Sequence, residues 1–291
     1  MSENKTVVYY HAHCPDGFGA ALAAWLHFGD AATYVPATHG ETIPGDMAGK
    51  DVYILDYCFK PEVMSVLAAQ ARSLTVLDHH KSAQESMARF SCGCNCRLKF
   101  DMAKSGAVLA WEAFHPGIPV PLLFRHIMDR DLWQWQLEHS EDYLMALDAL
   151  PFDFPAWKAV MDFTTDQYAE FVVRGQHMKA KFEDLSAKIA AKAAPISIFG
   201  VPGLAVNAPS EFASYVGQRL YQQSQTYAAI WRVNFHEGVP FVQVSLRGAP
   251  GFDCLAIAKQ LGGGGHAAAC AFRLPLSSLA EFLAGAIATT R

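Results

Sequence analysis

Short apolar segments alternate with helical patterns through the first 80 residues of the chain. Three buried strands are indicated by runs rich in Val, Ile, Leu and Tyr, at 6–10, 51–55 and 73–77. Between them the sequence predicts helices from about 18 to 28 and from Pro61 to 71, the second with proline at its first turn. Residues 32–36 form a weaker strand candidate. Strands alternating with helices predict βαβ units and a parallel sheet.

After residue 100 the pattern first becomes helical and then returns to strands. Two helices are expected first, one at 107–114 and one that reaches 129–133, and a long helical stretch follows at 165–194. Three strands are expected after it, at 196–199, 228–235 and 241–246. The long stretch at 165–194 is rich in charged residues, which is typical of a helical connector between domains.

The length of the chain favours two domains, because 291 residues exceed what one hydrophobic core usually serves. Hydrophobic residues make up 52% and charged residues 18%, which excludes a disordered chain. We expect an α/β fold with an N-terminal, Rossmann-like parallel-sheet domain and its helical connector at 1–190. A smaller α/β domain at 191–291 follows.

Composition also bears on location and partners. The first residues are polar and lack the apolar core of a signal peptide, and the longest apolar stretch, 18–28, contains His27 and is too short to cross a bilayer. Seven cysteines, an odd number in a chain of this size, favour reduced thiols in a cytoplasm. The net charge of −5 argues against binding of long duplex nucleic acid, so we expect a small partner. The short apolar stretch predicts no association with a membrane.

Polar side chains follow each of the three predicted strands. His11, His13 and Asp16 come after the first, Asp56 after the second, and the triplet Asp78, His79 and His80 after the third. Because parallel sheets gather their chemistry at the carboxyl ends of their strands, these residues should meet at one edge. The simpler alternative is that the histidines only cap a strand.

Carboxylates and imidazoles at adjacent strand ends are suitable ligands for one or two divalent metal ions. Asp56 is the best bridging candidate, because its strand should lie centrally, and His79 would be a terminal ligand. His80 would contact a phosphate or an acid outside the first coordination sphere. Asp129 and Asp131 offer a further ligand position, with helix capping as the competing explanation.

A glycine run near the C-terminus suggests an anion site. Gly263, Gly264 and Gly265, followed by His266, allow backbone amides to approach a phosphate closely. Arg247, at the end of a predicted strand, could provide a forked donor for the same anion. The alternative is a tight turn beside a solvated arginine.

Five of the cysteines have no clear role in the sequence. Cys92, Cys94 and Cys96 alternate in sequence, so they indicate either a structural zinc site or small side chains in an extended connector. Cys254 and Cys270 have no evident partner in the sequence.

Taken together, these motifs resemble the DHH phosphoesterase superfamily with a C-terminal DHHA1 domain, in its oligoribonuclease-like branch. The resemblance covers nearly the whole chain. It is carried by the segments 11–18, 55–57, 78–80, 129–133, 244–248 and 263–269.

The resemblance implies two Mn²⁺ ions on the first domain, with Mg²⁺ or Co²⁺ as alternatives, and a substrate cleft between the domains. The metal ligands it implies are His11 or His13, Asp16, Asp56, His79 and one of Asp129 and Asp131. The catalytic group would be Asp56, Asp78, His79 and His80. Phosphate would be bound by His80, Arg247, His266 and the glycines 263–265.

The first motif departs from the family pattern, which has two Asp residues separated by one position. Here Asp16 has Cys14 two residues before it and Phe18 two residues after it. Two alternatives remain open: a weak second metal site, or one in which Cys14 is a softer ligand. In the last motif, Cys270 replaces a glycine.

The resulting hypothesis is a hydrolase of phosphodiester bonds in short oligonucleotides, of the exonuclease or oligoribonuclease type. Cyclic dinucleotides and 3′-phosphonucleotides are alternative substrates of the same chemistry. A hypothesis from another class is a nucleotide-binding protein without turnover, which the incomplete first motif motivates. A homodimer is compatible with the sequence.

Overall fold

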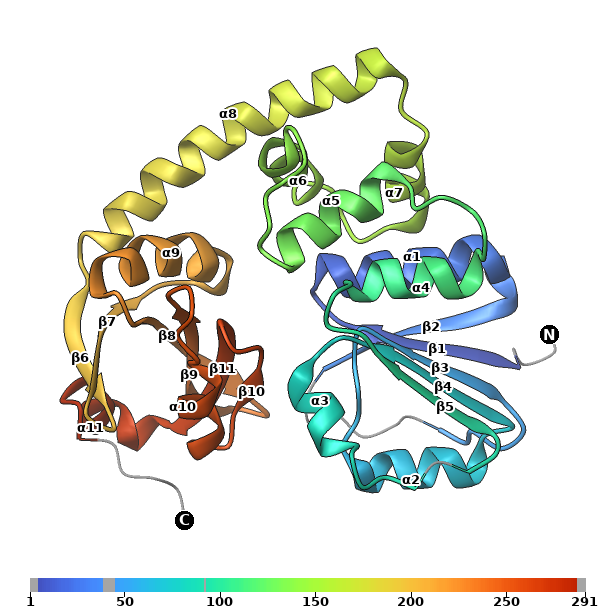
Figure 1. The fold of residues 1–291 in the computed structure, drawn as a ribbon, viewed down its shortest axis with the longest axis horizontal. Helices are drawn as coiled ribbons and strands as arrows, with labels where there is room; N and C mark the ends of the chain where they lie inside the picture. The colour runs from blue at the N-terminus through green and yellow to red at the C-terminus, as the bar shows by residue number, and fades with distance from the viewer. Residues whose placement is uncertain (1–4, 39–44, 92, 287–291) are drawn as a thin grey trace. The chain divides into compact units, whose positions relative to one another are not determined.

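The computed structural model describes residues 5–38, 45–91 and 93–286 (Figure 1). It divides into two compact units, Met1–Lys179 and Ala180–Arg291. The division lies within helix α8 (Thr165–Ala190), earlier than the boundary at 190 expected from the sequence. Among the described residues, no helix is both long and apolar enough to cross a membrane.

The first unit is built on a five-stranded sheet in the order β2-β1-β3-β4-β5. Every pairing in it is parallel, and β3 lies at its centre, as the sequence predicted. The strands are β1 (Thr6–His11), β2 (Ala32–Ala37), β3 (Asp51–Leu55), β4 (Ser73–Asp78) and β5 (Cys96–Phe100). The α/β class is thereby confirmed.

Helices cover both faces of this sheet, with α1 and α4 on one side and α2 on the other (Figure 1). Successive strand residues alternate between the two cores: Val8 packs on the α1 and α4 side, and Val7 on the α2 side. Burial on both faces explains why the strands are continuous apolar runs. The helices are α1 (Pro15–Phe28), α2 (Pro61–Gln70), α3 (Lys81–Ser86), α4 (Gly106–Phe114), α5 (Leu122–Asp131), α6 (Ser140–Leu147) and α7 (Phe154–Met161).

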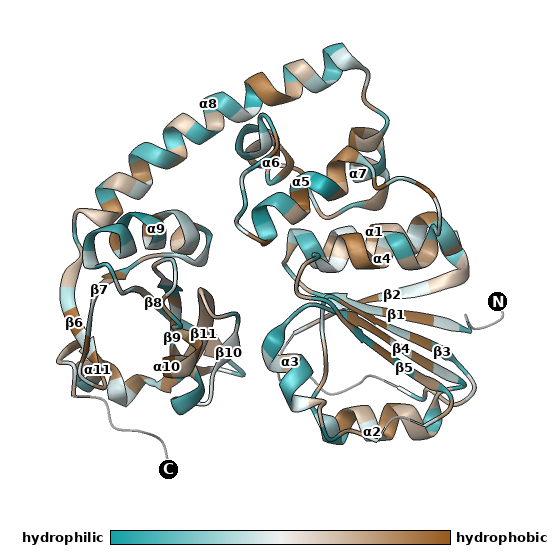
Figure 2. Ribbon diagram, in the orientation of Figure 1, coloured by the Kyte–Doolittle hydropathy of each residue, from teal (hydrophilic) through white to brown (hydrophobic). Residues whose placement is uncertain are grey.

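Two predicted helix boundaries need correction. α1 begins at Pro15 rather than near Phe18, because a proline fits the first helical position, where its missing N–H costs nothing. This start places Asp16 in the first turn of the helix. α8 ends at Ala190 rather than 194, because β6 begins at Ala194. Its surface is hydrophilic along much of its length, as expected of a charged connector (Figure 2).

The second unit holds a six-stranded sheet in the order β10-β11-β9-β8-β7-β6. Only β7 and β8 pair in parallel among the described strands of this sheet. α9 packs against one face, and residues of α10 and α11 join the core of the other. The elements are β6 (Ala194–Ile198), β7 (Val201–Asn207), α9 (Ala213–Ser224), β8 (Tyr227–His236), β9 (Val239–Gly248), α10 (Leu255–Gln260), β10 (Gly264–Gly265), β11 (Ala269–Pro275) and α11 (Leu279–Leu283).

Candidate metal centre

The carboxyl edge of the first sheet gathers acidic and imidazole side chains from several elements. His11 ends β1, Asp56 follows β3, and Asp78 ends β4 directly before His79 and His80. The first turn of α1 adds Asp16, and the end of α5 adds Asp131. Buried acids are rare unless they are paired or bind cations. Asp16, Asp56, Asp78 and His79 are each at most 2% exposed.

Asp56 connects two groups of side chains through its two carboxylate oxygens. Its Oδ2 accepts a hydrogen bond from Nδ1 of His11 at 3.3 Å, and its Oδ1 lies 3.1 Å from Nε2 of His79. The backbone of Asp56 is left-handed, with φ 54°, a conformation that costs about 1 kcal/mol and that Asp tolerates better than most residues. The strain turns the carboxylate toward the edge of the sheet.

Gly106 makes this position of Asp56 sterically feasible. A Cβ atom on Gly106 would lie 2.4 Å from Cβ of Asp56, which is too close for any side chain. In the sequence, Gly106 is notable only as the residue before the predicted helix 107–114. Its one further signal is a glycine where a helix-forming residue would be expected.

His79 is surrounded by carboxylates from three elements. Its Nε2 lies 3.1 Å from Asp56 Oδ1, 3.4 Å from Asp131 Oδ2 and 3.5 Å from Asp16 Oδ2. Asp131, not Asp129, therefore reaches the cluster. The carboxylate of Asp129 instead accepts hydrogen bonds from the backbone amides that follow α5, those of residues 136 and 137.

The first motif places its two histidines differently. His11 contacts Asp56, whereas His13 is exposed and adopts a left-handed backbone with φ 55°. None of the candidate metal-binding groups among the described residues includes His13. Of the two histidines proposed from the sequence, His11 is therefore the one in position to bind a metal.

Asp78 orients His80. Its Oδ1 accepts a hydrogen bond of 2.7 Å from Nδ1 of His80, and it also accepts bonds from the backbone amides of His79 and His80. This arrangement fixes the imidazole of His80, whose Nδ1 lies 4.0 Å from Asp56 Oδ1. Contact with an acid was one of the two roles predicted for His80, and Asp78 is that acid.

The histidines and carboxylates of the cluster shift one another's pKa values. Burial would lower the pKa of His11, but the hydrogen bond to Asp56 and the contact with Cys14 raise it to about 11. Burial would also lower the pKa of His79, but the neighbouring carboxylates of Asp56, Asp131 and Asp16 raise it to about 10. Burial raises the pKa of Asp16 well above its ordinary value, and the charge of Asp56 adds to this effect. The pKa of Asp56 is held well below its ordinary value despite burial, because His11 and His79 contact it.

The donors present fit divalent cations. Oδ1 of Asp56 is buried and faces Nε2 of His79 at 3.1 Å without hydrogen-bond geometry, an arrangement that suits two ligands of one cation. Three triads of the first unit have ligand atoms within 4.8 Å of one another: Asp16, His79 and Asp131; His11, Cys14 and Asp56; and Asp56, Asp78 and His80. Oxygen and imidazole donors are suitable for Mn²⁺ and Mg²⁺. Cys14, which the sequence left open as a softer ligand, thus lies beside His11 and Asp56.

In the second unit, Arg247 is held by α9. Its Nε and Nη2 donate to Oγ of Ser214 at 3.3 and 3.1 Å, and a Cβ atom on Gly217 would lie 2.5 Å from its Cγ. Burial lowers the pKa of Arg247. In the sheet Arg247 pairs with Ala269, so the turn that contains His266 lies next to it along β11. Ser214 was not predicted from the sequence, because it does not lie in a recognisable motif.

The glycine run forms part of this turn. A Cβ atom on Gly263 would lie 2.2 Å from the carbonyl oxygen of Ala271, and Gly265 has φ 129°. Glycine is therefore required here for close backbone packing. The proposed anion-binding role of Gly263, Gly264 and Gly265 stays a prediction.

Among the described residues, five cysteines are free thiols: Cys14, Cys58, Cys94, Cys254 and Cys270. Cys96 is disulfide-bonded, Cys94 is free and exposed, and Cys92 lies outside the described residues. In the second unit, Cys254 and Cys270 are both free, and the thiol of Cys270 donates a hydrogen bond of 3.3 Å to Sγ of Cys254. Their pairing across α10 and β11 was not visible in the sequence.

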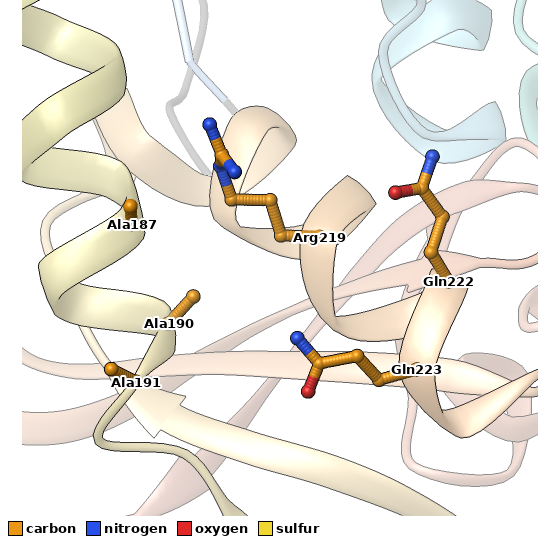
Figure 3. A pocket seen from close by; sticks show the side chains of 6 residues that line it. All are labelled: Ala187, Ala190, Ala191, Arg219, Gln222 and Gln223. Atoms are coloured by element: carbon orange, nitrogen blue, oxygen red, sulfur yellow. The ribbon is translucent and has the colours of Figure 1, made fainter.

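A pocket of about 340 Å³ lies between α8 and α9. Figure 3 shows alanine methyl groups of α8 facing polar side chains of α9. Its lining residues are Ala187, Ala190, Ala191, Arg219, Gln222 and Gln223. They include no carboxylate or imidazole, so this pocket does not fit a metal.

Comparisons with known proteins agree with the fold. No family model matches the chain. The uncharacterized protein R106 of Acanthamoeba polyphaga mimivirus is 27% identical over 283 residues, which cover 89% of this chain but only 65% of that relative.

Two solved structures are also similar. RecJ from Thermus thermophilus, in complex with Mn²⁺, has a TM-score of 0.53 at 14% identity and covers 96% of this chain and 51% of RecJ. PggH, a pGpG-specific phosphodiesterase from Vibrio cholerae, has a TM-score of 0.48 at 13% identity over 95% of both chains. The chain thus shares the fold of RecJ and spans about half of its length.

Proposed function

We propose that this protein is a metal-dependent phosphoesterase of the DHH type that hydrolyses phosphodiester bonds in short oligonucleotides. The observation that supports this proposal most strongly is the position of Asp56. It is 1% exposed, strained and a member of two ligand triads, and its Oδ1 faces Nε2 of His79 at 3.1 Å without hydrogen-bond geometry. Strain and unsatisfied buried groups concentrate at functional sites.

The residues suggest a division of roles. Asp16, Asp56, His79 and Asp131 would hold divalent cations, which supply Lewis-acid charge and lower the pKa of water when bound. His80, fixed by its 2.7 Å bond to Asp78, would donate a hydrogen bond to a phosphoryl oxygen as negative charge develops there. The left-handed turn at Asp56 and the packing of Gly106 would keep the ligands in place before substrate arrives.

The second unit would bind a phosphate of the substrate as a DHHA1-like module. Arg247 presents a guanidinium positioned by Ser214, and the turn with His266 adjoins it in the sheet. The net charge of −5 favours a substrate with few phosphates over a long duplex. Cyclic dinucleotides and 3′-phosphonucleotides offer the same chemistry.

A second candidate is a phosphoester-binding protein without turnover. It is favoured by one observation: Cys14 and Phe18 stand where a second carboxylate of the first motif would be. Metal content separates the two candidates, because less than about one divalent ion per chain with retained nucleotide affinity would favour the binding protein.

The test is hydrolysis by metal-stripped protein reloaded with Mn²⁺. Di- to pentanucleotides, cyclic dinucleotides and 3′-phosphonucleotides are the substrates. Asp56→Asn should lower turnover by on the order of 10²–10³-fold, the effect of losing one preorganised electrostatic group. Asp162→Asn, which removes only an exposed pair with Lys158, is the matched control. Absence of hydrolysis of every substrate, or full activity of Asp56→Asn, would refute the proposal.

A further inference from the structure

Two of the candidate metal-binding triads, which share no residue, differ in the chemistry of their donors. Asp16, His79 and Asp131 offer two carboxylates and one imidazole. The triad of His11, Cys14 and Asp56 offers a thiol in place of one carboxylate. Thiolates favour softer metals such as Zn²⁺ and Co²⁺, whereas carboxylates suit Mg²⁺ and Mn²⁺.

The structure shows which of the two positions next but one to Asp16, position 14 or position 18, faces the cluster. Phe18, two residues after Asp16, is 3% exposed and stacks on Phe154 with ring centroids 4.9 Å apart and an interplanar angle of 10°. It also packs edge-on against Trp157, within the helical core. Position 18 therefore points away from the acidic edge of the sheet. Position 14 points into it, because Sγ of Cys14 lies within 4.8 Å of ligand atoms of His11 and Asp56.

The local structure also presents Cys14 well as a ligand. It is the extended residue before α1, and its side chain makes no capping hydrogen bond. Burial, with the charge of Asp56 adding to it, raises the pKa of the Cys14 thiol, so the thiolate would form only when a metal ion displaces its proton. Asp56 adds a buried carboxylate to this group: its Oδ2 contacts Nδ1 of His11 at 3.3 Å, and its Oδ1 faces Nε2 of His79 at 3.1 Å without hydrogen-bond geometry.

We propose that Cys14 binds a metal as a thiolate, together with His11 and Asp56, and that this makes the centre select two different ions. The thiolate triad would take Zn²⁺ or Co²⁺, and the triad of Asp16, His79 and Asp131 would take Mn²⁺ or Mg²⁺. On binding, the S–H bond of Cys14 is replaced by a sulfur–metal bond and the proton leaves to solvent. The inference rests on the proposed function, since it assigns the ions of the same site.

Cobalt spectroscopy tests the sulfur ligand without any activity measurement. Metal-stripped protein titrated with Co²⁺ should develop a sulfur-to-cobalt charge-transfer band in the near ultraviolet that saturates at one ion per chain. Cys14→Ser should lose this band while remaining folded by circular dichroism. Cys94→Ser, which removes an exposed free thiol, should retain it. A full band in Cys14→Ser, or no band in the unsubstituted protein, would overturn the inference.

Substitution by a hard ligand tests metal selection. Cys14→Asp should lose the charge-transfer band and shift the preference for Zn²⁺ over Mn²⁺ at one site by on the order of 10–100-fold toward Mn²⁺, as competition with elemental analysis would measure. An unchanged preference would contradict the inference.

Alkylation supplies an independent readout. Bound Zn²⁺ should protect Cys14 from iodoacetamide, as located by peptide mass spectrometry, whereas Cys94 should react equally with and without the metal. Equal modification of Cys14 under both conditions would count against a thiolate ligand.

The outcomes separate this inference from the proposed function. Binding of two cobalt ions without a sulfur band would refute the role of Cys14 and leave the phosphoesterase intact. Binding of no divalent ion at all would refute both.

Discussion

The backbone amide of Gly106 donates a hydrogen bond of 2.6 Å to Oδ2 of Asp16, and the amide of Ala107 donates one of 2.9 Å to Oδ1. The first turn of α4 thus holds the carboxylate of α1 in place. Unpaired amides and the helix dipole both favour a negative charge there. The same glycine leaves space for Asp56. One residue thereby positions two carboxylates of the cluster.

Gly106→Ala should therefore damage the metal centre. Alanine normally stabilises a helix relative to glycine, but here its Cβ would lie 2.4 Å from Cβ of Asp56. Overpacking of this kind costs about 1–3 kcal/mol of the free energy of unfolding, and relief requires Asp56 to move. Urea unfolding should show the loss, and calorimetry should show weaker Mn²⁺ binding. Gly93→Ala, at an exposed glycine where the added Cβ would lie 3.0 Å from Oδ1 of Asn95, should leave Mn²⁺ binding unchanged. A stabilised Gly106→Ala protein would contradict this account.

The two aspartates at the end of α5 should respond differently to substitution. Asp131→Asn should weaken divalent metal binding with little change in stability, because its Oδ2 faces His79 at 3.4 Å and the side chain is partly accessible. Asp129→Asn should mainly lower stability, by about 1.5–3 kcal/mol, because it weakens charge-assisted hydrogen bonds from two backbone amides. Metal titration and thermal unfolding of both variants measure the contrast. The reverse pattern would show that Asp129 is the ligand.

Much of the first sheet was predictable from the sequence, because strands buried on both faces are continuous apolar runs bounded by clear helix signals. The convergence of Asp16, Asp56 and His79 followed from the topology of a parallel sheet. The choice between Asp129 and Asp131 could not be predicted, since a turn after α5 decides which carboxylate binds amides. The partnership of Cys254 with Cys270 depends on packing between α10 and β11, which leaves no periodic pattern.

Acidification should destabilise the first unit through His126. This ring is 1% exposed, and its nitrogens hydrogen-bond with Ser140 Oγ and Tyr168 OH. Burial lowers the pKa of His126 to about 4 from an ordinary value of 6.5. Between these values the unfolded chain binds a proton that the folded protein excludes. Stability is therefore present above pH 6.5 and lost as the pH falls toward 4, by up to about 3 kcal/mol.

The substitution His126→Gln tests this source of pH dependence. The variant should be less stable at neutral pH, because it cannot reproduce both hydrogen bonds, but its melting temperature should fall less between pH 7.5 and 5. His177→Gln, at an exposed position of α8, should keep the pH dependence of the unsubstituted protein. An equal fall in all three proteins would assign the pH dependence to other groups.

Arg247 should govern substrate affinity more than turnover. Its guanidinium is oriented by two hydrogen bonds to Ser214, and the forked geometry suits a phosphate. Arg247→Lys keeps the charge but loses the fork, so KM for a dinucleotide should rise by on the order of tenfold, about 1.4 kcal/mol, with a smaller change in kcat.

Two further variants separate orientation from charge. Ser214→Ala should raise KM in the same direction but less, because it frees the guanidinium without removing it. Arg219→Lys, in the pocket between α8 and α9, should leave KM unchanged (Figure 3). If Arg247→Lys instead lowered kcat at constant KM, the guanidinium would interact mainly with the transition state, and its role would be catalytic rather than one of binding.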